Sequence, residues 1–226
     1  MNKFRGVFSI KAVIFDFDGT LANTLPICFY AFQQVFKEFD NRELSSDEIK
    51  SMFGPSETGI IRENLLHPNI EQAIELYYTN YKEKHTELVE FNQHMDDLLR
   101  FIKAKGMKLG IVTGKARRSL DISVQALNME GWFDVSITGD DVTHPKPHQE
   151  GVLKALSILG IENNKAMFIG DSEADILAGK RADVYTIGVN WLPAFQANEF
   201  TTIPDSSYSS IADFMNFLKT DIAYES

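Results

Sequence analysis

The first hydrophobic signal along the chain is a short apolar run, residues 12–15, that ends abruptly in the polar sequence DFDGT. An apolar run of about four to eight residues that is closed by a turn signal is typical of a strand buried on both faces, as in a parallel sheet. Asp16 and Asp18 follow the run with Phe17 between them, so continued strand geometry would point both carboxylates to one side. They would lie at the carboxyl end of the strand, where open α/β sheets bind their ligands.

The stretch after this strand has the periodicity of helices. Apolar residues recur on one face of a first helix, at Leu25, Cys28, Phe29, Phe32, Val35, Phe36 and Phe39. Ser45 and Glu48 have the spacing of a capping box, which predicts a second helix that ends near Phe53. Gly-Pro and His-Pro pairs then separate a helix from Ser56 toward residue 66 and another over residues 69–88. A single crossover helix needs far fewer residues, so we predict that residues 23–91 form an inserted helical domain.

Strands and helices alternate in the rest of the chain. Strands are predicted over residues 107–113, 134–138, 166–169 and 184–189, and helices around 95–105, 116–128, 149–159, 174–181 and 211–218, with a long surface loop over 190–210. Alternating strands and helices imply a parallel sheet flanked by helices. The predicted fold class is therefore α/β, with residues 1–22 and 92–226 forming the core domain.

Composition excludes several classes of protein. The 226 residues are 44% hydrophobic and 24% charged, as in an ordinary globular protein. A formal net charge of −10 argues against a general nucleic-acid-binding protein, which needs basic residues to neutralise phosphates. No uninterrupted apolar stretch of about 18 residues occurs, so no membrane span is expected. Cys28 is the only cysteine, which excludes an intrachain disulfide and favours a reducing compartment. We therefore expect a soluble, cytoplasmic protein in which Cys28 packs in the core rather than acting as a nucleophile.

The aspartate pair at the end of the first strand suggests a specific chemistry. Two adjacent carboxylates that are buried without partners repel each other. Mg²⁺ removes this problem, because it prefers carboxylates together with phosphate oxygens as ligands. With the charge balanced in this way, one carboxylate can attack phosphorus while the other transfers a proton. The alternative, on these residues alone, is an ordinary Asp-Gly turn.

Two other segments carry groups that can bind phosphate. The Thr113 hydroxyl and the Gly114 N–H follow a predicted strand at the start of a helix, where an anion is favoured. A simple helix cap accounts for Thr113 equally well. Lys146 lies between two prolines, which restrict the backbone and can hold its ammonium in one place. An exposed surface lysine is the alternative here.

Asp171 and Asp175 follow another predicted strand and are four residues apart. If Asp171 ends the strand and Asp175 lies in the first turn of the next helix, both can face Asp16 and Asp18. Acidic residues are also favoured at a helix N-terminus by the helix dipole, which is the alternative reading of Asp175. Asp175 is therefore assigned a supporting role.

Four motifs now stand in one order: DFDGT, a hydrophobic-Thr-Gly, Lys-Pro and GDSxxD. In this order they resemble the four motifs of the haloacid dehalogenase superfamily of hydrolases. The resemblance covers nearly the whole chain, including a helical cap inserted after the first strand. It implies a Rossmann-like core in which the first strand is central and all four motifs converge at one edge. One departure is KPHQ, because family members often have Lys-Pro-x-Pro.

The resemblance also implies a role for each motif residue. Asp16 would be the nucleophile that forms an aspartyl-phosphate, and Asp18 would protonate the leaving oxygen and then activate water. The phosphoryl-binding residues would be Thr113, Gly114 and Lys146, and the Mg²⁺ ligands would be Asp16, the backbone carbonyl of Asp18 and Asp171, with Asp175 behind them. The superfamily's true dehalogenases lack the acid at the position of Asp18, so its presence favours phosphate chemistry.

Within the superfamily, the chain is most similar to phosphoglycolate phosphatases and to a related branch of bacterial pyrophosphatases, through FGPSE, TGKAR and GDDVTHPKP. A second anionic group on the substrate would need further cations, for which the candidates are Lys50, Arg62, Lys115 and Arg117. Lys50 and Arg62 are favoured because they lie on either side of FGPSE, although any of these cations can be an exposed surface charge. His144 and His148 flank Lys146 without metal-ligand spacing and are expected to be loop residues.

We therefore expect a Mg²⁺-dependent phosphohydrolase of small phosphorylated metabolites, similar to phosphoglycolate phosphatase, that acts as a monomer or homodimer. The alternatives are an inorganic pyrophosphatase of the same branch and a phosphomutase of the β-phosphoglucomutase type, which shares the core residues and differs in the cap. A catalytically silent binding domain would have lost at least one of these core residues, and all of them are present. Neither a nucleic acid nor a membrane is expected as a partner.

Overall fold

The centre of the molecule is a sheet of six strands in which all neighbouring strands are parallel, in the order β4-β3-β2-β5-β6-β7. A computed structural model describes residues 8–197 and 199–223. The strands are β2 (Ala12–Phe15), β3 (Lys108–Val112), β4 (Val135–Ile137), β5 (Ala166–Gly170), β6 (Tyr185–Val189) and β7 (Ser206–Tyr208). The first strand of this sheet, β2, is central, as the sequence resemblance implies.

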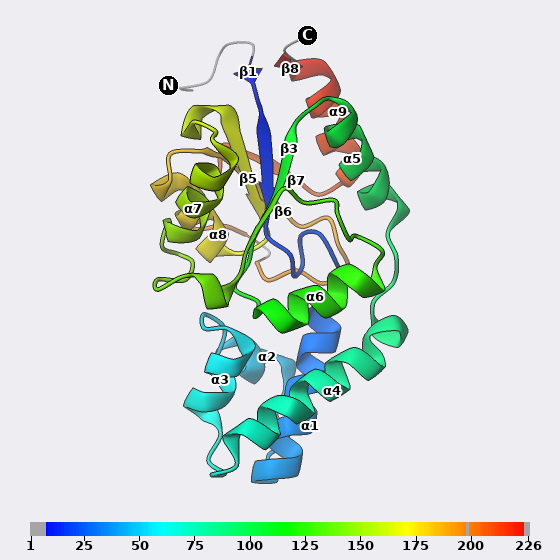
Figure 1. Ribbon diagram of the computed structural model, residues 1–226, viewed down its shortest axis with the longest axis vertical. Coiled ribbons are helices and arrows are strands. Elements are labelled where there is room, and N and C mark those ends of the chain that lie inside the picture. The colour runs from blue at the N-terminus through cyan, green and yellow to red at the C-terminus, as the bar shows by residue number, and fades with distance from the viewer. Residues whose placement is uncertain (1–7, 198, 224–226) are drawn as a thin grey trace.

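Helices cover both faces of the sheet (Figure 1). Helices α7 (Glu150–Leu159) and α8 (Glu173–Arg181) pack on one face, and α5 (Gln93–Ala104) and α9 (Ile211–Asp221) pack on the other. Successive residues of β2 enter different cores, because Ala12 and Ile14 face α7 and α8 while Val13 and Phe15 face the opposite side. The strand is fully buried on both faces, which is why its sequence is a continuous apolar run.

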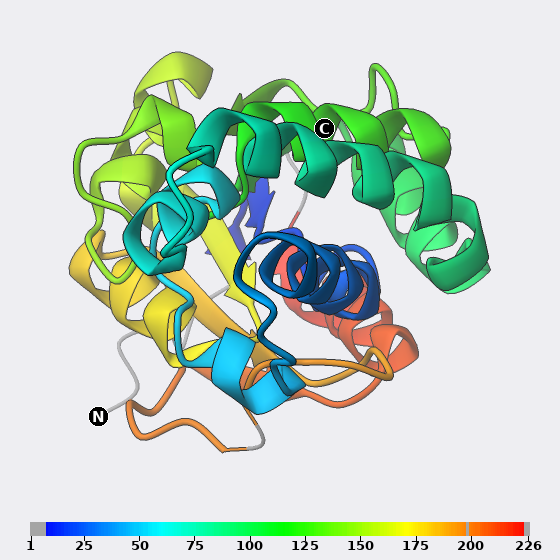
Figure 2. The same cartoon turned by 90° about the horizontal axis from the view of Figure 1, so that it is seen from below.

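The inserted helices form a separate layer beyond the carboxyl ends of the strands (Figures 1 and 2). They are α1 (Leu25–Asp40), α2 (Ser46–Lys50), α3 (Glu57–Asn64) and α4 (Ile70–Leu88). Helix α1 packs along α4, with the rings of Phe32 and Tyr77 4.7 Å apart. Helix α6 (Arg117–Ala126) lies between this layer and the sheet. The predicted α/β fold with a helical insertion is confirmed, and we refer to α1–α4 as the cap.

The domain boundaries at 22/23 and 91/92 stay a prediction, and the ends of the predicted core, residues 1–7 and 224–226, lie outside the described residues. Helix α5, which follows the predicted boundary, packs against β3 and α9. In the part of the chain that the structure describes, no helix is both long and apolar enough to cross a membrane.

Two features of the fold differ from the sequence prediction. The stretch 190–210 contains β7, an edge strand of three polar or half-buried residues with no apolar run to reveal it. The residue just before β7 fixes its position, because the Asp205 carboxylate accepts a hydrogen bond from the Thr186 N–H of β6 at 2.8 Å. A second, two-stranded sheet joins β1 (Phe8–Ser9) to β8 (Ile222–Ala223). Strands of two residues carry no periodicity that a sequence pattern can detect.

Candidate active site

Three neighbouring strands deliver the motif residues to one edge of the sheet. Asp16 follows β2, Thr113 follows β3 and Asp171 follows β5, and β2 is paired with both of the others. Backbone pairing continues one residue past β2, because the Asp16 N–H donates to the Ile169 carbonyl at 2.8 Å. All three side chains are buried, with exposed fractions of 3%, 5% and 0%. The parallel register therefore holds the nucleophile candidate between its two neighbours.

Lys146 lies at the centre of the carboxylate cluster. Its Nζ is 2.7 Å from Asp16 Oδ1 and 2.6 Å from Asp175 Oδ1, and only 11% of its side chain is exposed. Burial opposes the ammonium charge, but the two carboxylates outweigh it and raise the pKa of Lys146 above its usual value. The lysine is therefore charged at neutral pH. Asp175 contacts Lys146 directly, so the supporting role predicted for Asp175 would be to hold this lysine in place.

The carboxylates of Asp16, Asp171 and Asp175 fit a divalent cation. Each offers an oxygen, and these oxygens lie within 4.8 Å of one another. Burial, partly offset by Lys146, raises the pKa of Asp16 to about 7, and burial together with the charges of Asp16 and Asp175 raises that of Asp171 well above its usual value. The raised pKa values reflect that one ammonium does not compensate three ionised acids in this buried cluster, and a metal ion would supply the missing positive charge. Whether Asp18 contributes its backbone carbonyl stays a prediction.

Asp171 is held rigidly by the two segments that surround it. Its Oδ1 accepts a hydrogen bond from Thr20 Oγ1 at 3.0 Å, and its Oδ2 accepts one from the Gln196 N–H at 2.6 Å. Gly19 passes so close that a Cβ there would meet Asp171 Oδ2 at 2.3 Å, and its φ of +80° is one that only glycine adopts without strain. The loop that contains Gly19 and Thr20 is also held by Trp191, whose indole N–H donates to the Thr20 carbonyl at 2.8 Å. The glycine of DFDGT is therefore required by this close approach.

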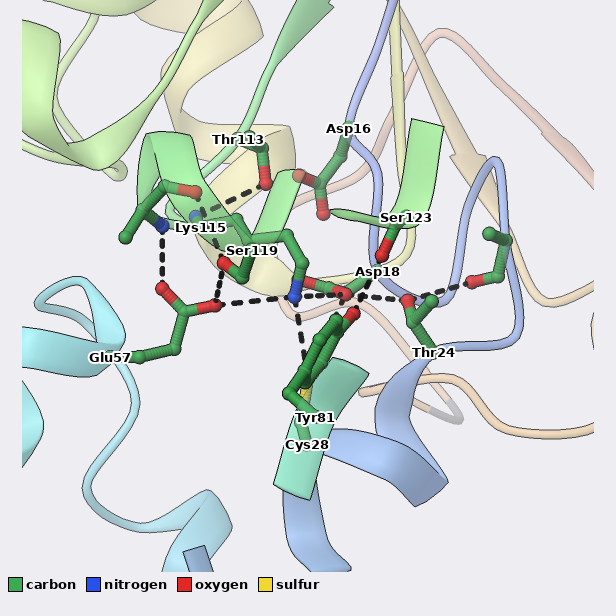
Figure 3. Close-up of polar contacts among 12 residues, drawn as sticks. Asp16, Asp18, Thr24, Cys28, Glu57, Tyr81, Thr113, Lys115, Ser119 and Ser123 are labelled. Carbon is green, nitrogen blue, oxygen red and sulfur yellow. Dashed lines mark hydrogen bonds and ion pairs between the residues drawn. The ribbon is translucent and has the colours of Figure 1, made fainter. Parts of the chain in front are cut away.

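Asp16 pairs with Lys146, whereas Asp18 contacts Lys115 (Figure 3). The Asp18 Oδ1 is 3.1 Å from Lys115 Nζ and accepts a hydrogen bond from Thr24 Oγ1 at 2.5 Å. The side chain is 16% exposed, so it can reach a bound substrate while staying oriented. The Cys28 thiol lies 3.8 Å from the same oxygen, and burial raises its pKa above the usual value, which keeps it neutral. Cys28 is buried, in agreement with the packing role predicted for it.

Lys115 is not the exposed cation that residue statistics suggest for a loop lysine. Its side chain has no exposed surface, and its Nζ lies 3.2 Å from Glu57 Oε1 of the cap as well as near Asp18 (Figure 3). The ammonium also sits 4.5 Å above the centre of the Tyr81 ring. Burial disfavours its charge, but these neighbours, Asp18 foremost, raise the pKa of Lys115 well above its usual value. Sequence reasoning named Lys115 but missed Glu57, for which its place in FGPSE was the available signal.

A cavity joins these groups. Its polar wall contains Asp16, Asp18, Thr113, Gly114 and Lys146, so the structure brings the predicted catalytic and phosphoryl-binding residues together. The wall toward the cap is mainly apolar, with Leu25, Phe32, Phe53 and Ile60, and its charged group is the Glu57 carboxylate. Both domains therefore enclose the reacting centre, which excludes water when the cap is closed.

Lys50 and Arg62, the cap cations predicted to bind substrate, lie outside the described lining of the cavity. Lys50 donates to the carbonyls of Phe195 and Gln196 at 3.3 Å, and Arg62 is 53% exposed and pairs with Glu71 at 2.8 Å. Neither residue lines the cavity among the residues that the structure describes. Lys50 instead holds the loop whose Gln196 N–H binds Asp171, so its link to the site is indirect. The substrate-binding role of both residues stays a prediction.

Two further sequence predictions concern the surface near Lys146. Arg117 pairs with Asp141 at 2.6 Å and is 40% exposed. His144 and His148 are exposed loop residues, as expected, but the fold brings both rings next to Glu150. The His144 Nδ1 lies 3.0 Å from Glu150 Oε2, and the Glu150 N–H donates to His148 Nδ1 at 3.1 Å. These contacts fix the start of α7, which follows the loop of Lys146.

The fold and the site together define a hydrolase of the haloacid dehalogenase type. The chain belongs to that family, because the sequence profile of haloacid dehalogenase-like hydrolases matches residues 13–189. It is therefore a phosphohydrolase, and the predicted class of enzyme is confirmed.

Among known proteins, the chain is similar over nearly its full length to bacterial pyrophosphatases. The chain is 33% identical over 214 residues to the pyrophosphatase PpaX of Bacillus pumilus, covering 94% of this chain and 98% of the relative. It is 32% identical over 217 residues to the PpaX of Bacillus cereus, covering 92% and 96%.

Solved structures share the fold at lower identity. A predicted phosphoglycolate phosphatase from Haemophilus somnus superimposes with a TM-score of 0.82 at 21% identity, over 94% of this chain and 99% of that one. CbbY from Rhodobacter sphaeroides in complex with phosphate does so with a TM-score of 0.78 at 24% identity, over 91% and 96%. These two likenesses support the fold alone.

Proposed function

We propose that this enzyme is a Mg²⁺-dependent phosphohydrolase whose preferred substrate is inorganic pyrophosphate. The observation that carries the choice of substrate is the match to PpaX pyrophosphatases over nearly the full length of both chains. The likeness to a predicted phosphoglycolate phosphatase is at 21% identity and supports the fold only. The relatives therefore favour the pyrophosphatase alternative over the phosphoglycolate phosphatase that motif similarity placed first.

The first chemical step uses Asp16 as the nucleophile. One oxygen of its carboxylate attacks phosphorus, and the bond to the leaving oxygen breaks, which gives an aspartyl-phosphate and free phosphate. Lys146, 2.7 Å from Asp16, is placed to bind the oxygens of the transferring group, and the Thr113 hydroxyl and Gly114 N–H lie in the same wall. Mg²⁺, held by Asp16, Asp171 and the carbonyl of Asp18, would neutralise negative charge on the phosphoryl oxygens. Asp175 keeps Lys146 in place through its 2.6 Å contact.

Asp18 handles the proton in both steps. In its protonated form it gives a proton to the leaving phosphate, and as a carboxylate it then takes a proton from water. The resulting hydroxide attacks phosphorus, the bond to Asp16 breaks, and a second phosphate is released. Thr24 and Lys115 hold the Asp18 side chain on the side of the cavity that faces the cap. One residue can serve both steps because the first step leaves Asp18 as a carboxylate, which is the form that the second step needs as a base.

A phosphate-release panel tests this assignment. It contains pyrophosphate, phosphoglycolate, β-glucose 1-phosphate and nucleotides, each assayed with Mg²⁺. We expect the highest kcat/KM on pyrophosphate. A higher kcat/KM on phosphoglycolate would restore the phosphatase reading, and conversion of β-glucose 1-phosphate to its 6-phosphate without phosphate release would establish the mutase. We propose that the enzyme works in the cytoplasm as a monomer or homodimer, without nucleic-acid or membrane partners.

A further inference from the structure

The cap places a single carboxylate into a ready-made anion site of the core. Glu57, the first residue of α3, is 6% exposed and contacts three donors. Its Oε1 lies 3.2 Å from Lys115 Nζ and accepts from Ser119 Oγ at 2.5 Å, and its Oε2 accepts from the Ala116 N–H at 2.5 Å. An ammonium, a hydroxyl and a backbone N–H within five consecutive residues are donors that bind phosphate as well as carboxylate.

This anion site lies on the leaving-group side of the reacting centre. Lys115 Nζ is also 3.1 Å from Asp18 Oδ1, the group assigned to protonate the leaving oxygen. A proton donor must be within hydrogen-bond distance of the atom that it protonates. The ammonium therefore lies close to whatever is attached to the leaving oxygen, whereas Lys146 holds the opposite, phosphoryl side.

Charge balance makes Glu57 a competitor for a substrate anion. Among the cavity-lining residues that the structure describes, the cations are Lys115 and Lys146, and apart from Glu57 the wall toward the cap is mainly apolar. Lys115 is shared between Asp18 and Glu57, so its charge is already neutralised. A second anionic group on the substrate would meet repulsion from Glu57 unless that carboxylate gives up its donors. A neutral leaving group meets no such barrier.

We propose that Lys115, the Ala116 N–H and Ser119 bind the second anionic group of the substrate, and that Glu57 occupies this subsite until that group displaces it. For pyrophosphate the second group is the leaving phosphate, so the inference rests on the proposed function and deepens it. Exchange of the cap carboxylate for a substrate phosphate shifts α3 relative to α6. Lys115 and Glu57 together thereby determine how strongly the enzyme prefers substrates with a charged leaving group.

The test compares charged with neutral leaving groups in matched variants. The substrates are pyrophosphate, phosphoglycolate and p-nitrophenyl phosphate, and the measured quantity is the ratio of kcat/KM on each anionic substrate to kcat/KM on p-nitrophenyl phosphate. Glu57→Gln keeps the size of the side chain and removes the competing charge, so we expect this ratio to rise about tenfold, mainly through KM. Glu63→Gln makes the same change on an exposed position of α3 and should leave the ratio unchanged.

A double variant provides the opposite change and removes both charges of the pair between the cap and the core. Glu57→Gln combined with Lys115→Met removes both members of the pair and should lower the ratio at least tenfold relative to Glu57→Gln alone. Lys115→Met also takes the ammonium away from Asp18, and the two effects are separated by the kinetic parameter that each changes. Loss of the anion subsite raises KM for the anionic substrates, whereas weaker proton transfer by Asp18 lowers kcat. An unchanged ratio in both variants would overturn the inference and leave Glu57 as a simple cap contact. If the wild-type enzyme hydrolyses phosphoglycolate but not pyrophosphate, the proposed function is wrong, and the phosphoglycolate ratio still decides the role of Lys115.

Discussion

Replacement of Lys146 by methionine tests the arrangement of the carboxylate cluster. In the wild-type protein its ammonium contacts Asp16 and Asp175 at 2.7 and 2.6 Å, and both carboxylates are at least 96% buried at the side chain. Removing one partner from a buried ion pair costs about 3–5 kcal/mol, because the other partner stays buried and unpaired. For a chain of this length such a loss corresponds to a fall in Tm of roughly 10 °C. We expect this loss together with the loss of phosphate release.

Urea unfolding monitored by circular dichroism measures the change in the free energy of unfolding. The matched control is Lys154→Met, which removes an ammonium that is 46% exposed and pairs with Glu150 at 2.8 Å. A surface pair of this kind contributes about 0–1 kcal/mol. Equal losses in the two variants would refute the arrangement of charges described for Lys146.

Added Mg²⁺ extends the same experiment. Without Lys146 the three acids carry more uncompensated charge, so Mg²⁺ should stabilise Lys146→Met more than it stabilises the wild-type protein. At a concentration about 100 times its Kd, a bound ion adds about 2.7 kcal/mol to the free energy of unfolding. Equal stabilisation of both proteins would contradict a metal site that is built on Asp16 and Asp171 beside Lys146.

Three further predictions follow from the site and the cap. Asp16→Asn should abolish phosphate release and leave the circular dichroism spectrum unchanged, and wild-type turnover in this variant would reject the nucleophile. EDTA should remove activity and Mg²⁺ should restore it, whereas full activity in the chelator would exclude a metal-dependent reaction. Burial and the charge of Lys115 lower the pKa of His85 to about 4, so His85 is neutral in the folded protein at pH 7. The unfolded chain takes up this proton below about pH 6.5, so stability should fall with pH, by about 2 kcal/mol at pH 5, and His85→Gln should reduce that loss in urea titrations at both pH values.

The sequence was sufficient to predict the sheet edge at which the site lies. A buried parallel strand is a continuous apolar run, and its end is marked by the first polar residues, so Asp16, Thr113 and Asp171 could be assigned to one edge. Strand order then decides their proximity, and β2 between β3 and β5 provides it. The family resemblance added Lys146, which a loop sequence alone would not distinguish from a surface lysine.

The contacts between cap and core could not be predicted in the same way. Lys115 and Glu57 are 58 residues apart and lie in different domains, and neither carries a local pattern that indicates burial. Their environment depends on how α3 and α4 dock on α6, which is a property of tertiary packing. Lys50 and Arg62 illustrate the converse, because proximity to FGPSE in sequence did not place them in the cavity. Sequence spacing defines a strand end well and a domain interface poorly.

The hydrogen bond from the Trp191 indole to the Thr20 carbonyl gives the enzyme an intrinsic optical probe. The chain has two tryptophans, and the other, Trp132, stacks beneath Arg100 at 5.2 Å. Replacing Trp132 by phenylalanine would leave a single tryptophan, hydrogen-bonded to the DFDGT loop and excited selectively at wavelengths where tyrosine does not absorb. Its emission would then follow rearrangement of that loop directly, so ligand binding and turnover could be timed by stopped-flow fluorescence without any label.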